Sequence, residues 1–582
     1  MLILPDSARG GNDRAHNSGD RPAGGDWCGW ALLCLLLWLV PAVPASAGGA
    51  DAVAEALRQR VGELRASGRI EVQGVVIGAQ NILAEFYARR AYQPAWGDPA
   101  RVAGLQAMLE RATEHGLDPG DFFASRLQDL VQTATGPEGR ADLDLLLTEA
   151  LIRYGYQRRF GKVNPVDMDP AWNFRRGFDD AEDPVATLAQ AVAAPSLAQY
   201  LDARLPGSPW YHLLQAGLAR YRAMAAAGGW PVLPEGPVLR PGDRAWRVPL
   251  LRQRLQVEGD LPAEPPPDEP ELFDPALAAA VMRFQERHSL GRDGVVGAMT
   301  LAALNVPVQA RIDQLRLSLE RVRWLTGDVP GTYVVVNVAG FRAGYVRDHR
   351  LVWNSRVVVG RTARQTPIFR GRMTYIEINP TWTIPPTILR EDVLPRLRRD
   401  PGYLAREHIS VLDGRGRRVD PASVDWTAVG RNVPYTLRQE PGPDNALGRI
   451  KLMFPNPHMV YLHDTPARAL FDRPERSFSS GCIRVEDPLA LAVLVLDDPR
   501  WDRPALEAAI ATGETRQVPL RIPVPVLIVY LTSIADPSGT VHFFRDVYGR
   551  DAPLLAALNG PVRLELPVHV GAAGAPARPA AL

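Results

Sequence analysis

The chain has 582 residues, which is enough for roughly three or four domains, and its 46% apolar and 23% charged residues are ordinary for a globular protein. With 66 basic and 65 acidic residues its formal charge is +1, so it lacks the basic footprint of a nucleic-acid-binding protein. We therefore expect no nucleic acid among its partners.

The N-terminal segment, residues 1–47, resembles an export signal. Its uncharged apolar core, about residues 30–40, is shorter than the roughly 20 residues that a membrane-spanning helix needs. The sequence ASA at 45–47 matches a signal cleavage site, but the residues before the core hold three Arg and four Asp and are not net positive. A cleaved signal peptide, an uncleaved N-terminal anchor and a buried helix all stay open. The first two predict a periplasmic protein, either secreted by its signal peptide or anchored in the inner membrane.

Residues 51–235 show the periodicity of helices. Apolar residues recur at spacings of three and four in VAEALRQRVGELRASG and VAGLQAMLERATEHGLDP, and Gly and Pro end the runs. This pattern predicts a helical scaffold domain without evident chemistry.

Residues 244–306 read as a compact unit of three short helices. Asp274-Pro275 is typical of an N-cap followed by Pro at the first helical position, and Leu277, Val281 and Phe284 form one apolar stripe. The unit resembles the peptidoglycan-binding domain of many cell-wall enzymes. The matching residues are Leu255, Gln256, Phe273, Asp274, Ala280, Val281, Phe284, Gln285, Leu290, Asp293, Gly294, Val296, Gly297, Thr300, Leu301, Leu304 and Asn305. The resemblance implies a protein near the cell wall and identifies no contact residue.

Residues 330–535 change to strand-like patterns. Alternating β-branched residues and turn pairs predict an antiparallel β-rich domain. A polar and helical stretch at 389–445 interrupts the strands and has the length of a lid-like insertion. With a disordered tail predicted at 555–582, the whole chain reads as a multidomain α+β protein: a helical scaffold, a small three-helix domain and a β-rich domain with an inserted lid.

One cysteine stands apart from the other two. Cys28 and Cys34 lie in the N-terminal segment, so its removal would leave Cys482 alone. Exported proteins usually pair their cysteines, and an unpaired one is either a reactive thiol or an inert buried residue.

The neighbours of Cys482 favour a reactive thiol. A thiol nucleophile needs a base, and His463 ends the apolar run MVYLH nineteen positions earlier. Gly481 permits close approach of a substrate carbonyl, and the amides of Gly481 and Cys482 suit an oxyanion. Arg484 is open to two roles, an internal salt bridge that orients the loop or a contact with a substrate carboxylate. Asp487-Pro488 predicts the start of a helix that packs the loop against the core.

The sequence from His463 to Ser479-Ser480-Gly481-Cys482-Ile483-Arg484 resembles the L,D-transpeptidase catalytic domain. The family pattern is a His, a variable gap, then Ser or Thr, one residue, Gly, Cys, an aliphatic residue and Arg. Many members carry His before the Gly, where this chain has Ser480. That departure resembles the larger proteobacterial type, which has a helical scaffold and a peptidoglycan-binding domain. It leaves two partners open for the ring of His463, a backbone carbonyl or Ser480.

The resemblance implies acyl transfer on peptidoglycan stem peptides. Cys482 would attack the third residue of a tetrapeptide stem and release D-alanine, and a second stem would resolve the thioester to a 3→3 cross-link. The resemblance implies catalytic roles for Cys482, His463, Gly481 and Ser480. Substrate contacts are expected at Arg484, Tyr461, Trp382 and Ser479, with core packing as the alternative role of the two aromatic residues. It implies no cofactor, no metal, and carbapenem β-lactams as covalent inhibitors.

Three other functions compete with this interpretation. A zinc hydrolase would need three or four closely spaced ligands; His458, His463 and Asp464 are the only nearby set in the sequence, and no HExxH-type helix appears. An L,D-carboxypeptidase or hydrolase would use water in place of the acceptor amine, which the sequence hardly distinguishes. A non-catalytic peptidoglycan-binding protein would leave Cys482 inert. The acceptor is also open: a second stem, a free D-amino acid or a lipoprotein.

Overall fold

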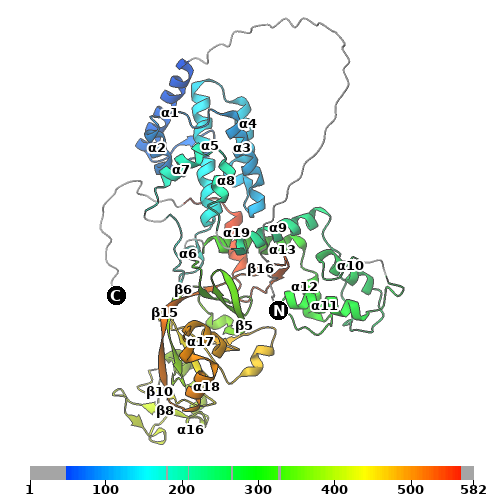
Figure 1. The fold of residues 1–582 in the computed structure, drawn as a ribbon, viewed down its shortest axis with the longest axis vertical. Coiled ribbons are helices and arrows are strands. Elements are labelled where there is room, and N and C mark those ends of the chain that lie inside the picture. Colours follow the sequence, from blue (N-terminus) through cyan, green and yellow to red (C-terminus); the bar gives the residue numbers. More distant parts are fainter. Residues whose placement is uncertain are drawn as a thin grey trace, which may run out of the picture. The chain divides into compact units, whose positions relative to one another are not determined.

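A computed structural model describes residues 47–564, except 179–180, 207–208, 264–266, 326–328, 401 and 431. It is a multidomain α+β protein, as predicted, with helices in its first half and strands mainly in its second (Figure 1). The predicted signal peptide or anchor lies outside the described residues. Within the described part, none of the helices is both long and apolar enough to span a bilayer.

Helices form the N-terminal region, as the periodicity predicts. They are α1 (Ala47–Ser67), α2 (Gln80–Arg89), α3 (Pro99–Glu110), α4 (Ala124–Thr133), α5 (Gly136–Phe160), α6 (Pro165–Met168), α7 (Pro184–Ala193) and α8 (Leu197–Asp202), with the short hairpin β1 (Glu71–Val72) and β2 (Val75–Val76) between α1 and α2. Leu145, Leu146 and Leu147 of α5 are fully buried in one cluster with Leu83 and Leu105. The central helix α5 is therefore the core of this region.

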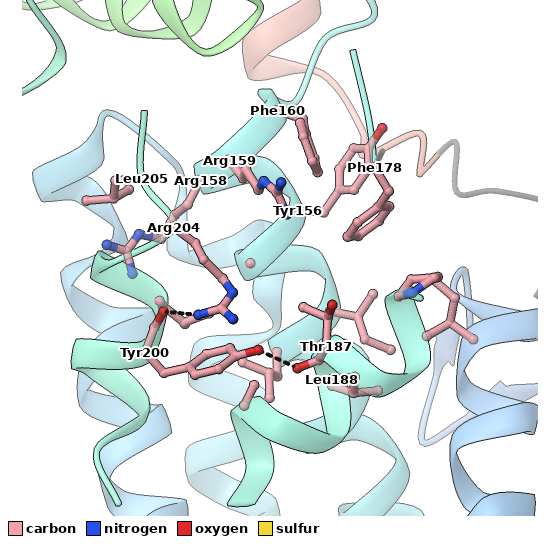
Figure 2. A pocket seen from close by; sticks show the side chains of 17 residues that line it. Tyr156, Arg158, Arg159, Phe160, Phe178, Thr187, Leu188, Tyr200, Arg204 and Leu205 are labelled. Atoms are coloured by element: carbon pink, nitrogen blue, oxygen red, sulfur yellow. Dashed lines mark hydrogen bonds between the residues drawn. The ribbon is translucent and has the colours of Figure 1, made fainter. Parts of the chain in front are cut away.

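A pocket opens between α5, α7 and α8 (Figure 2). Apolar and aromatic side chains line it, among them Phe160, Leu188 and Tyr200. The Tyr200 hydroxyl donates to the Thr187 carbonyl at 2.9 Å, and the Arg204 guanidinium stacks on the Tyr200 ring. None of the predicted site residues lines this pocket.

The small unit contains three helices, as predicted. They are α10 (Val248–Glu258), α11 (Pro275–Arg287) and α12 (Ala298–Leu304), and they lie in the chain between α9 (Pro209–Ala226) and α13 (Val308–Arg323). The Asp274 side chain accepts a hydrogen bond from the Leu277 amide at 2.8 Å, so the expected N-cap is present. Leu277, Val281 and Phe284 are fully buried in its core.

The β-rich region centres on a nine-stranded sheet. Its order is β13 (Ser477–Ser479), β5 (Arg350–Gly360), β14 (Ile483–Val485), β12 (Leu462–His463), β11 (Ile450–Met453), β6 (Arg370–Ile378), β15 (Arg516–Val529), β3 (Tyr333–Asn337) and β4 (Arg342–Arg347). The expectation of an antiparallel sheet is wrong in part, because β12–β14, β13–β5 and β15–β3 are parallel pairs. Alternation along a strand does not encode the direction of its partner.

Residues 382–440 form an inserted subdomain with its own sheet and core. Its strands are β7 (Trp382–Thr383), β10 (Thr436–Gln439), β8 (Ile409–Leu412) and β9 (Arg418–Val419), in that order. Helical segments join them: α14 (Pro386–Ile388), a π-helical turn (Leu389–Val393), α15 (Leu394–Leu397) and α16 (Tyr403–Arg406). The stretch is thus less helical than expected, because strands of two to four residues are too short to show a period of two.

The chain continues through α17 (Pro488–Leu496) and α18 (Arg503–Ala511), and after the sheet through β16 (Ser533–Ala535), β17 (Val541–Phe543) and α19 (Asp551–Asn559). The prediction of a disordered tail from residue 555 is wrong for its first residues, because α19 runs to Asn559 and buries Leu554 and Leu558. Apolar contacts stabilise this helical end, and residues 565–582 lie outside the described residues.

Candidate active site

Four polar side chains form one row across the central sheet. In the strand register, Glu377 of β6 pairs with Lys451 of β11, Lys451 with His463 of β12, and His463 with Arg484 of β14. Side chains in register on adjacent strands share a face of the sheet. These four segments are distant in sequence, so only the register of the sheet brings them together.

The other face of the same strands is the hydrophobic core. Leu452, Leu462 and Ile483 alternate with the polar row, and all three are fully buried in one cluster with residues of α17. Helix α17 starts where the sequence predicts, with the Asp487 side chain accepting from the Ala490 amide. The core therefore holds β12 and β14 rigidly under the candidate site.

Cys482 stands just before β14 on the same face as Arg484, two residues away. It is a free cysteine with a partly exposed side chain, and its thiol points to the Met459 carbonyl at 3.7 Å. It is therefore a diagonal neighbour of His463. Among the described residues the thiol makes no hydrogen bond to His463, and catalytic hydrogen bonds often tighten only in the substrate complex.

A backbone carbonyl, the first of the two expected partners, orients the ring of His463. The carbonyl of Asp464 accepts a hydrogen bond from Nδ1 at 2.5 Å, which leaves Nε2 as the basic nitrogen of the neutral ring. The Asp464 carboxylate is itself held by the Arg449 amide at 3.0 Å and by Arg468 at 3.1 Å. The ring is thus fixed by a chain of bonded groups.

The nucleophile loop, residues 479–482, is held by internal hydrogen bonds. Ser479 is buried, donates to the Cys482 carbonyl at 2.5 Å and accepts from the Gly481 amide at 3.1 Å. Gly481 has a φ of +117°, which favours glycine. The Ser479 hydroxyl, expected to contact substrate, and the Gly481 amide, expected to stabilise an oxyanion, are thus both already hydrogen-bonded inside the loop. Among the described residues no acceptor is bound to the Cys482 amide.

Ser480 and Arg484 differ from each other in their surroundings. The Ser480 hydroxyl accepts from Arg364 at 2.9 Å, so it does not orient His463. Arg484 forms none of the ion pairs found among the described residues, and its Nε is buried without a hydrogen-bond partner. The internal salt bridge considered for Arg484 is therefore absent from the described part of the chain.

Tyr461 joins the inserted subdomain to the thiol. It is opposite Cys482, as the bond from the Ile483 amide to its carbonyl at 3.0 Å shows. Burial raises the pKa of Tyr461 far above its ordinary value. Hydrogen bonding to Cys482 raises this pKa further, and hydrogen bonding to Trp382 lowers it. Its ring centroid is 5.7 Å from that of His463. The two predicted aromatic residues thus meet beside the thiol.

Lys451 was not predicted as a site residue. Its Nζ is 4.3 Å from the centre of the Tyr461 ring and 4.0 Å from Glu377, and its side chain is 14% exposed. The sequence offered one signal for this residue: lysine occurs only at Lys451 and Lys162, and arginine is used at every other Lys or Arg position. With Arg484 it gives the site two cations against one carboxylate.

Burial keeps both the thiol and the imidazole neutral. It lowers the pKa of His463 to about 3, with the Arg484 charge as the next cause, while the backbone of Asp464 and of Leu447 acts in the opposite direction. Burial also raises the pKa of the Cys482 thiol, against the effects of Tyr461, Lys451 and Arg484. At neutral pH the two groups are therefore a thiol and a neutral imidazole, so a thiolate would form only by loss of the thiol proton.

This pairing predicts how alkylation of Cys482 depends on pH. Because the thiol pKa is raised, we expect the iodoacetamide rate constant to rise close to tenfold per pH unit between about pH 6 and 8, following the thiolate fraction. Peptide mass spectrometry separates Cys482 from Cys28 and Cys34. A rate constant already level below pH 7 would instead reveal a preformed thiolate–imidazolium pair.

The ligands considered for zinc do not converge. The His458 ring packs on Phe369, with 4.8 Å between centroids, while Asp464 binds two arginines. Within the described residues, no three His, Cys, Asp or Glu side chains gather closely enough to hold a metal ion.

The candidate site thus combines a free thiol directly before β14 with a neutral imidazole on the adjacent strand β12. Residues 331–520 match the family described as the L,D-transpeptidase catalytic domain, residues 81–218 match the "Scaffold domain", and residues 247–304 match the "Putative peptidoglycan binding domain". Residues 331–520 thus match the L,D-transpeptidase catalytic domain, and the resemblance drawn from the sequence is confirmed.

Known proteins agree with this assignment over part of the chain. A Haemophilus influenzae protein named "Putative L,D-transpeptidase" is 36% identical over 247 residues, which is 42% of this chain and 50% of the relative. The chain thus matches about half the length of that relative.

Two solved structures are similar at lower identity. An L,D-transpeptidase from Xylanimonas cellulosilytica shares 17% identity over 51% of this chain and 98% of its own, with a TM-score of 0.16. A structure described as the Ldtfm-avibactam carbamoyl enzyme shares 13% identity over 34% of this chain and 49% of its own, also with a TM-score of 0.16. Scores this low carry no functional information.

Proposed function

We propose that this protein is a cysteine L,D-transpeptidase that forms 3→3 cross-links between peptidoglycan stem peptides. The observation that carries the proposal is the register of His463 on β12 with Arg484 on β14, with the free Cys482 directly before β14 and its thiol acted on by Tyr461, Lys451 and Arg484. Acyl transfer uses a nucleophile and a base, and a cation without an acidic partner suits a peptide that carries a carboxylate.

The first half of the reaction forms a thioester. The Cys482 sulfur attacks the carbonyl of the third stem residue while Nε2 of His463 takes the thiol proton. The Cys482 amide donates to the oxyanion. The C–N bond to the terminal D-alanine then breaks, and the imidazolium returns the proton to the departing amine.

The second half transfers the acyl group. The side-chain amine of an acceptor stem attacks the thioester and gives a proton to His463. The C–S bond breaks as the new amide forms, and the imidazolium returns the proton to the Cys482 thiolate. Both halves exchange one acyl bond for another, so no nucleotide or metal enters the balance.

The surrounding residues suit a peptide donor. Lys451 and Arg484 supply positive charge for the stem carboxylates, and their effect on Cys482 also favours the thiolate as it forms. Trp382 and Tyr461 offer aromatic surface from the inserted subdomain and the sheet. The matches to peptidoglycan-acting domains support a location outside the cytoplasm, to which the signal peptide or anchor expected at 1–47 would deliver the protein.

The test is a product analysis of purified protein with tetrapeptide muropeptides. We expect mass spectrometry to find dimers with the mass of two substrates minus one D-alanine, and fragmentation to place the bond between the third residues. Tripeptide monomers without dimers would instead identify a carboxypeptidase. No product of either kind would favour a non-catalytic wall-binding protein.

A further inference from the structure

Each residue of the nucleophile loop before Cys482 is bonded to a second loop, which we call the support loop, residues 361–366. The Arg361 amide donates to the Ser479 carbonyl at 2.9 Å, and the Thr366 hydroxyl donates to the Gly481 carbonyl at 2.8 Å. Between them, Arg364 donates to the Ser480 hydroxyl at 2.9 Å. The position of Cys482 therefore depends on the support loop.

The support loop is itself held at its two ends. Gly360 donates to the Thr366 hydroxyl at 2.9 Å, and the Tyr548 hydroxyl donates to the Gly360 carbonyl at 2.6 Å. A side chain at Gly360 would bring its Cβ within 2.2 Å of the Arg364 carbonyl, so the close turn requires glycine. The fully buried Thr366 thus closes a compact loop from which the Arg364 side chain projects.

The same guanidinium reaches the inserted subdomain. Arg364 Nη1 is 2.6 Å from Asp392 and its Nη2 binds Glu391, both in the π-helical turn Leu389–Val393. Arg361 adds a longer contact with Asp392, at 3.6 Å. The Arg364 side chain is only 11% exposed, but Glu391 is 57% and Asp392 34% exposed, so the bond to Asp392 is the less screened of the two.

These contacts make Arg364 a bridge. Its Nη1 binds both Asp392 and Ser480, so a shift of the π-helical turn changes the geometry available to Ser480. Turns of this rare helix type frequently occur at functional sites. Trp382, the first residue of the inserted subdomain, also acts on Tyr461 beside the thiol, which gives the subdomain two routes to the site.

We propose that Arg364 is a positioning residue that couples the inserted subdomain to the nucleophile loop through Asp392, Glu391 and Ser480. This inference rests on the proposed function, because the loop's position matters for a reaction at Cys482. Arg364 acts through Ser480 and touches no reacting atom.

The central experiment is a double-mutant cycle between Arg364→Gln and Ser480→Ala in the full chain. With tetrapeptide muropeptides we expect Arg364→Gln to lower kcat about 10- to 100-fold, the loss that a displacement of about 1 Å can cause, with KM within about twofold of wild type. The double variant should be no worse than Arg364→Gln, because both changes remove one connection. Arg364→Lys keeps the charge and should recover part of kcat.

A second pair of changes keeps Arg364 and removes its partners. Glu391→Gln with Asp392→Asn should lower kcat in the same direction, and this variant stands in if Arg364→Gln does not fold. The matched control is Arg417→Gln, which removes an exposed arginine–carboxylate pair with Asp413 in the same subdomain and should leave kcat unchanged. Independent, multiplying losses in the cycle, or an unchanged kcat in the partner variant, would overturn the proposal.

Alkylation of Cys482 separates this inference from the proposed function. Iodoacetamide needs no stem peptide, so its rate constant reports the nucleophile loop even if wild type makes no cross-links. Arg364→Gln and Ser480→Ala should each change the rate constant at least threefold, and the double variant should match Arg364→Gln. Equal rate constants in wild type and both single variants would refute the coupling whatever the reaction proves to be.

Discussion

Replacing Cys482 by alanine should abolish turnover of tetrapeptide stems, with a loss of at least about 10⁴-fold, the scale seen when a covalent nucleophile is removed. The side chain is small and partly exposed, so the change opens little cavity in the core. The measurement is cross-linked product per enzyme by mass spectrometry, with the melting temperature as the check on the fold.

The same variant tests the acyl-enzyme directly. A carbapenem should add its mass to the wild-type protein and not to Cys482→Ala, because ring opening needs the thiolate. Cys28→Ala with Cys34→Ala is the matched control and should keep the adduct. An adduct that survives the loss of Cys482 would move the nucleophile to another residue.

Replacing His463 by glutamine should lower kcat about 10²- to 10⁴-fold, the range for a missing general acid–base. Glutamine can still donate to the Asp464 carbonyl, so the strand end keeps its hydrogen bond while the basic nitrogen is lost. His463→Ala should also abolish turnover but leaves that carbonyl without its partner. Single-turnover acylation and steady-state turnover should fall together.

His458→Gln is the control for this change. His458 is five residues upstream, packs on Phe369 and lies outside the polar row, so its variant should turn over stems at close to the wild-type rate. Near-normal turnover in His463→Gln and His463→Ala, with the fold retained, would remove His463 from the mechanism.

The neutral state of the Cys482 thiol and the His463 imidazole also determines the pH dependence that we expect. With the pKa of His463 lowered to about 3, the imidazole is already a base throughout the range in which the protein would be assayed. The acid limb of a pH–rate profile would therefore not report an ordinary histidine near 6.5. The rate should instead rise on the alkaline side, as the Cys482 thiol ionises.

The sequence alone predicted most of the local elements and the candidate reacting residues. Helical periodicity, the Asp274 and Asp487 caps and the apolar stripe of the small unit are properties of residues three or four apart, so they can be read before folding. The spacing around Cys482, with His463 upstream, carried the family resemblance in the same way.

Only the tertiary structure decided what surrounds those residues. The row Glu377–Lys451–His463–Arg484 and the bridge from Asp392 through Arg364 to Ser480 join segments that are tens of residues apart. Their meeting depends on strand order and register, including the unexpected parallel pairs, and no local period encodes these. The physical reason is that sheet pairing is set by how all the strands bury their apolar faces together, which is a property of the whole domain.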